Sequence, residues 1–87
     1  MNQDRPPLIV TGQIYLNEAL NEYIIVTKNN RGQISYAGNG FMGRQIDEDF
    51  IDAFPPVDPE DVSPEELNML ISFCPSGTVP RVGFIKE

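Results

Sequence analysis

The sequence has no histidine, one cysteine and only six lysine or arginine residues, against thirteen aspartate or glutamate residues among its 87. Without histidine, the side chain that most often serves as a general base near neutral pH is missing. A single cysteine excludes an intrachain disulfide, and the simplest interpretation is a reducing, cytoplasmic location. We therefore expect a protein that is not an enzyme and that uses no cofactor and no metal.

Long hydrophobic runs are also absent. No stretch approaches the roughly 20 apolar residues needed to span a bilayer, and the first ten residues lack a basic segment followed by a long apolar one. We expect neither a signal peptide nor a membrane partner. The length indicates a single domain over residues 1–87, with a flexible N-terminus at residues 1–7. A hydrophobic fraction of 40% is typical of a folded chain.

The first half of the chain predicts strands. β-Branched and aromatic residues favour strands at residues 8–15 and 22–28. Asn and Gly within residues 29–32 tolerate positive φ, so the chain can reverse there, and the alternating residues 33–37 are expected to pair back on the second strand. The segment 16–22 is a loop or a single helical turn.

A glycine-loosened turn and a fourth short strand are expected at residues 38–46, followed by a helical insertion at about residues 47–74. Phe50 and Phe54 are four residues apart and mark the apolar side of a first helix. Two consecutive prolines at 55 and 56 end that helix.

Two further helix starts are predicted at Asp58 and Ser63. Each residue is a candidate N-cap, because a proline follows at N1 and an acid at N3. After Ser63, apolar residues recur at helical spacing at Leu67, Leu70, Ile71 and Cys74. The segment 75–77 ends this helix, and residues 81–87 are expected to form a closing strand.

This order of elements predicts an α+β fold, namely a small antiparallel β-meander with a helical insertion and a C-terminal strand. In outline the order resembles that of SH3-like barrels. The resemblance implies that the sheet closes into a small barrel, and an open α+β sheet is the alternative.

Two short motifs match ligand-binding patterns only in part. Residues 38–43 read Gly-x-Gly-x-x-Gly, which in dinucleotide-binding folds lets the backbone approach a pyrophosphate at a helix N-terminus. This chain is too short for such a fold, and the three acids at 47–49 would repel phosphate. Glu48 and Asp52 share one helical face and could hold Mg²⁺ weakly, but a solvated face is the commoner outcome.

Cys74 falls on the apolar side of the second helix, near its C-terminus. The helix dipole disfavours a thiolate at that end. We therefore expect a buried thiol that contributes to packing.

The charges are unevenly distributed. Residues 47–66 hold nine carboxylates and no cation, whereas residues 23–46 hold three cations and no carboxylate. Acids near helix N-termini complement free N–H groups and the helix dipole, which accounts for Asp58, Asp61, Glu65 and Glu66. The other five are candidate partner-binding residues: Asp47, Glu48, Asp49, Asp52 and Glu60. The alternative, that all nine serve only capping and solubility, stays open.

We interpret the chain as a small acidic protein-binding module whose acidic helical face engages a basic surface of a partner protein. In size and charge it resembles acidic inhibitors made by bacteriophages, including those that mimic the charge of DNA. The resemblance implies inhibition of a host protein at a site that normally holds a polyanion. The prolines of residues 54–59 would stiffen the acidic segment and lower its ordering cost on binding.

The alternative function is a single-stranded nucleic-acid-binding β-hairpin. Aromatic rings beside cations recognise single strands by stacking and charge, and the candidate residues are Lys28, Arg31, Tyr36, Phe41 and Arg44. Three cations are few, and the acidic segment repels phosphate unless it faces away. Nucleic acid is therefore the second-ranked partner.

Overall fold

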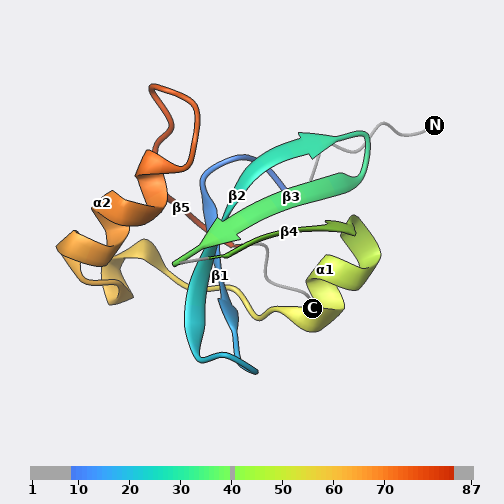
Figure 1. Cartoon of the computed structure of the whole chain (residues 1–87), viewed down its shortest axis with the longest axis horizontal. Helices are drawn as coiled ribbons and strands as arrows, with labels where there is room; N and C mark the ends of the chain where they lie inside the picture. The colour runs from blue at the N-terminus through green and yellow to red at the C-terminus, as the bar shows by residue number, and fades with distance from the viewer. Residues whose placement is uncertain (1–8, 40, 84–87) are drawn as a thin grey trace.

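The computed structural model describes residues 9–39 and 41–83, and Figure 1 shows the arrangement of their elements. The described residues form a five-stranded, mostly antiparallel sheet from β1 (Gln13–Asn17), β2 (Glu22–Asn30), β3 (Gln33–Gly38), β4 (Phe41–Ile46) and β5 (Arg81–Val82). Between β4 and β5 come α1 (Asp47–Ala53), the 3₁₀ helix η1 (Pro59–Asp61) and α2 (Pro64–Ser72). The fold is α+β.

The sheet is open. Its strand order is β4-β3-β2-β1-β5, so β4 and β5 lie at opposite edges. The first four strands form the predicted antiparallel meander, and β5 pairs with β1 in parallel. The SH3-like barrel is not confirmed, because the sheet of the described residues is not closed.

The hairpin of β2 and β3 forms where it was expected and extends further, with Asn30 paired to Gln33. The reversal falls on Arg31 (φ 56°) and Gly32 (φ 88°), the positive-φ pair of a type I′ turn. The sequence had suggested Asn and Gly for the positive φ; Gly32 adopts it, and Arg31 takes the position expected of an Asn. Asn29 has another role: its Oδ1 accepts a hydrogen bond from Gly32 N (3.0 Å), and its Nδ2 donates to Ile9 O (2.6 Å).

The first strand is shorter at its start than predicted. The prediction was residues 8–15, and β1 begins only at Gln13. A turn precedes it, in which Gln13 N donates to Val10 O (3.2 Å) and Gly12 adopts φ 101°. The predicted closing strand at 81–87 is confirmed only for its first two residues, and 84–87, like 1–7, lie outside the described residues.

Two hydrophobic cores lie on opposite faces of the sheet. The first joins Tyr15, Ile24, Val26, Ile34 and Tyr36 to Ile9, to Phe50 of α1 and to Phe54 just after it. The second joins Ile14 and Ile25 to Val62 and to Leu70 of α2. Consecutive residues of a strand point to opposite faces, which explains why neighbours such as Ile14 and Tyr15 enter different cores. Figure 1 shows α1 and α2 on the two sides of the sheet.

The connection between the helices runs along the outer edge of β1. Leu16 N donates to Pro55 O and Val57 N donates to Ile14 O, both at 2.9 Å, and Tyr15 and Pro56 form an isolated antiparallel bridge. The predicted end of the first helix before the prolines is confirmed. The same prolines also place the chain beside β1, so that β5 and residues 55–57 together cover that edge.

Both predicted N-caps are confirmed. Asp58 Oδ1 accepts a hydrogen bond from Glu60 N (2.9 Å) and caps η1, and Ser63 Oγ accepts from Glu66 N (3.3 Å) and caps α2. Within the described part of the chain the reciprocal bond of a capping box, from Ser63 N to the Glu66 carboxylate, is not made. Ser63 therefore carries the side-chain capping of α2.

We expect Ser63→Ala to lower the free energy of unfolding by about 1 kcal/mol, because the backbone N–H of Glu66 at the start of α2 loses its hydrogen-bond acceptor. Urea unfolding followed by circular dichroism measures the change. Ser76→Ala is the matched control, since Ser76 is an exposed serine outside the helices and its replacement should change stability by no more than a few tenths of a kcal/mol. Equal midpoints for the two variants would show that the cap contributes nothing.

Candidate interaction surfaces

The acidic segment is divided between the two sides of the sheet. Asp49 and Asp52 are exposed on α1, over the first core, and we call them the α1 acidic group. A second set follows on η1 and α2, over the second core; this α2 acidic group consists of Asp58, Glu60, Asp61 and Glu65, all exposed. The structure therefore separates Glu60 from the other predicted partner-binding residues. The side chains of Asp47 and Glu48 lie outside the described residues.

The backbone under these carboxylates is firmly anchored. Phe50 is fully buried, Phe54 and Val62 are each 6% exposed, and Leu70 is fully buried. Within the described residues, the carboxylates of Asp49, Glu60, Asp61 and Glu65 form no ion pair and accept no hydrogen bond. Unneutralised charges on an ordered scaffold require little further ordering when they meet a partner.

The three predicted cations lie in the hairpin of β2 and β3 and on the neighbouring strand β4. Lys28 is opposite Ser35 on β3, and Ser35 is opposite Arg44 on β4, so the two cations flank Ser35 about 10 Å apart, two inter-strand spacings. Arg31 is at the tip of the turn between β2 and β3. All three cations are exposed, and none forms an ion pair with another described residue.

A β-bulge determines which face these cations occupy. Val26 is opposite Tyr36, but Lys28 is opposite Ser35, so two residues of β2 are matched by one of β3. The extra residue places Lys28 on the opposite face from Val26. Lys28 and Arg44 therefore share a face, which is the face of the second core.

Tyr36 points away from the cations. Its ring lies in the first core, with its centroid 5.5 Å from that of Phe50 and 5.3 Å from that of Phe54, and the residue is 9% exposed. The side chain of Phe41 lies outside the described residues. The structure thus groups the cations named in the nucleic-acid hypothesis without the tyrosine that was expected to stack beside them.

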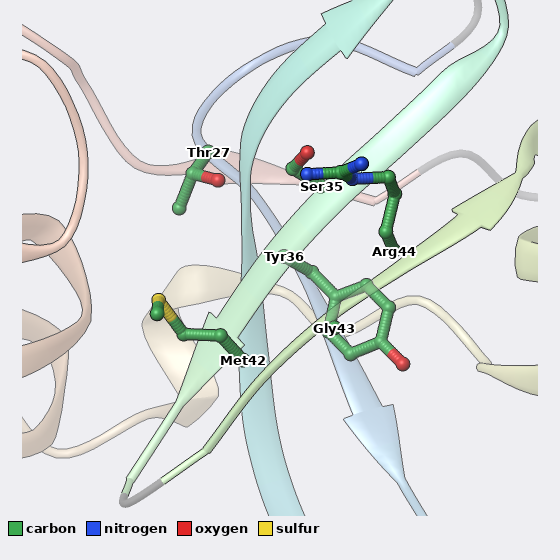
Figure 2. Close-up of a pocket in the computed structure, with 6 residues that line it drawn as sticks. All are labelled: Thr27, Ser35, Tyr36, Met42, Gly43 and Arg44. Carbon is green, nitrogen blue, oxygen red and sulfur yellow. The ribbon is translucent and has the colours of Figure 1, made fainter.

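An open depression of about 400 Å³ lies on the face that carries the cations, and sequence reasoning missed it. Figure 2 shows the residues around it: Thr27, Ser35, Tyr36, Met42, Gly43 and Arg44. A cross-strand row explains its position, because Ile14, Ile25, Ala37 and Met42 are successive partners. Ile14 and Ile25 are buried beside α2, whereas Met42 at the far end of the row is 83% exposed. We give the name cationic face to the part of the depression lined by Thr27, Ser35, Met42 and Arg44, together with Lys28, which is opposite Ser35.

The cationic face could have been predicted from the alternation of Met42, Gly43 and Arg44 in the sequence, because alternation puts the two long side chains on one side of β4. Gly43 itself lies under the Tyr36 ring, and an added Cβ would collide with the ring's Cζ and hydroxyl oxygen. The glycine motif at 38–43 therefore belongs to a hairpin between β3 and β4. Its last glycine is explained by aromatic packing and not by the approach of a phosphate.

Cys74 follows α2 and is half-buried against the second core. Its Sγ donates to Val26 O (3.6 Å) and lies 3.9 Å from Leu70 O. Burial raises the pKa of the thiol, so the group is protonated at neutral pH and is a weak nucleophile. The environment is that of a packing residue.

Other kinds of site find no support among the described residues. They contain no cluster of three or more side chains able to hold a metal ion. None of their helices combines the length and the apolar character needed to cross a membrane. Comparison of the chain with protein-family models, with curated proteins and with solved structures gives no match.

Proposed function

We propose that the chain is a non-enzymatic protein-binding module that engages a basic surface of a partner protein through the carboxylates of residues 47–66. The proposal rests on the exposure of the carboxylates in the α1 and α2 acidic groups, four of which have a charge that no described cation neutralises. They are exposed, they stand on a backbone anchored in two cores, and Asp49, Glu60, Asp61 and Glu65 are unneutralised by any described cation.

The proposed partner presents lysine and arginine in a site that otherwise holds a polyanion. Carboxylates fixed on a compact scaffold attract such a site over several ångströms and compete with nucleic acid for it. An inhibitor of a nucleic-acid-binding protein, of the kind that bacteriophages make, would act in this way. The α1 acidic group is the proposed centre of contact, because Asp47 and Glu48 precede it and make four acids in six residues.

Two double variants, each removing two charges, test the proposal. Asp49→Asn with Asp52→Asn acts on α1, and Glu60→Gln with Glu65→Gln acts on the other side of the sheet while leaving both caps intact. A partner is first captured from a lysate on the wild-type protein and identified by mass spectrometry. Surface plasmon resonance at two ionic strengths then compares the three proteins.

We expect the α1 variant to associate about threefold to tenfold more slowly at low salt, and the difference to shrink at high salt. The second variant should differ less from wild type. Both melting temperatures should stay within a few degrees of wild type, because neither variant removes a buried contact. Unchanged association rates for both variants would eliminate the acidic segment as the contact surface, and a collapse of the melts would show that the acids are structural.

A further inference from the structure

Among the described residues, the outer edge of β4 has no strand paired to it. β4 pairs with β3 on one side over all six of its residues, and no described segment makes backbone hydrogen bonds to its other side. An antiparallel strand at an edge directs alternate N–H and C=O groups outward, and such an edge is a template for another strand. On the other side of the meander, β5 and residues 55–57 already pair with β1, and β5, the strand at that edge, has only two residues.

The chemistry beside this edge is cationic. Arg44 on β4 and Lys28 on β2 flank Ser35. The depression is lined by Arg44 and Ser35 together with Thr27 and Met42. Residues 23–46 contain no carboxylate. α2 covers the part of this face at Ile14 and Ile25, whereas at β4 no described helix covers it and Met42 is exposed.

We propose that the β4 edge binds an extended acidic segment of a partner protein as an added strand. The outward backbone groups of β4 pair with the segment, and acidic side chains at every second position lie on the cationic face, close to Arg44. The intervening side chains point to the other face, where α1 lies against β3 and β4 and carries exposed Asp49. We therefore expect the partner segment to carry uncharged side chains at these intervening positions.

The charges favour such a partner over a second copy of this chain. Pairing β4 with β4 of another copy would bring two sets of Lys28, Arg31 and Arg44 together, and like charges across an interface cost binding energy. The chain's own acids lie largely in helices, where the backbone is not available for strand pairing. The surface is distinct from the one proposed above and has the opposite charge.

The probe is a blocked, fluorescent eight-residue peptide in which Glu and Thr alternate. Anisotropy measures its affinity for wild type, for Arg44→Gln and for Arg81→Gln. We expect Arg44→Gln to weaken binding about tenfold, the loss of one charge-assisted contact. Arg81→Gln is the matched control, because Arg81 is also an exposed arginine on an edge strand but lies at the far edge of the sheet. Its affinity should stay within about twofold of wild type.

Hydrogen exchange and two competitors make the test specific. The peptide should slow exchange of alternate β4 amides, and a peptide with the same residues in blocks, four Glu then four Thr, should bind at least about fivefold more weakly, because strand addition requires acids on one face. Equal effects of the two arginine variants, or unprotected β4 amides, would overturn the proposal. If an oligothymidylate bound more tightly than the acidic peptide, the β4 edge would be a nucleic-acid-binding site instead. If sedimentation showed a dimer and β4 amides were protected in it, the edge would be a site of self-association instead.

Discussion

Replacing Phe50 by alanine is expected to lower the free energy of unfolding by about 3–5 kcal/mol. Phe50 is fully buried, and its ring is the meeting point of the first core, with centroid distances of 4.8 Å to Tyr15, 5.0 Å to Phe54 and 5.5 Å to Tyr36. Alanine would leave a cavity and remove three aromatic contacts at once. A chain of this length has a stability margin of roughly 4–13 kcal/mol, so the loss takes a large part of it.

Urea unfolding followed by tyrosine fluorescence and by circular dichroism measures this loss. Phe73→Ala is the matched control, because Phe73 is 40% exposed and belongs to neither core. It should cost no more than about 1 kcal/mol. A similar cost for the two variants would mean that α1 is not held on the sheet by Phe50.

Gly12→Ala is expected to destabilise the protein by about 3 kcal/mol or more. Gly12 adopts φ 101°, which side-chain-bearing residues rarely do, and an added Cβ would collide with the carbonyl oxygen of Val79. The residue also joins two strands to β1, since its N–H donates to Val26 O and its carbonyl accepts from Arg81 N, both at 2.9 Å. To relieve the collision, Val79 would have to move away from residue 12, and this movement would separate the nearby β5 from β1.

Gly77→Ala separates the cost of the positive φ from the cost of the collision with Val79. Gly77 has φ 91°, but an added Cβ would meet no atom within 4 Å, so this variant carries backbone strain alone and should cost about 1–2 kcal/mol. Thermal and urea unfolding of both variants give the difference. If Gly12→Ala were no more destabilising than Gly77→Ala, the contact between Gly12 and Val79 would have no energetic weight.

Signals that act within a few residues were readable from the sequence. The cap at Ser63, the end of α1 before Pro55 and the reversal after Asn30 depend on hydrogen bonds and dihedral angles of immediate neighbours. Phe50 and Phe54 were assigned to one apolar side for the same reason, because helical spacing is a local property. These features formed where they were predicted.

Features that depend on distant partners were not readable. The parallel pairing of β5, the path of Pro55–Val57 along β1 and the separation of Glu60 from α1 all follow from which face each helix covers. The bulge after Val26 reverses the alternation of β2, so no simple periodicity would have placed Lys28 beside Arg44. Tyr36 was named as a surface ring because its aromatic partners come from a helix later in the chain.

Because β5 pairs with β1 from far along the chain, the sheet can be completed only after most of the chain has been synthesised. Gln13 pairs with Arg81, and closing a loop of that length costs more entropy than closing a hairpin. Within the meander, each strand pairs with the next one in the sequence, so β1 to β4 can assemble on a partly made chain before β5 is added. Until Pro55–Val57 and then Arg81 leave the ribosome, β1 is a second unpaired edge, and the nascent protein is open to strand exchange on both sides.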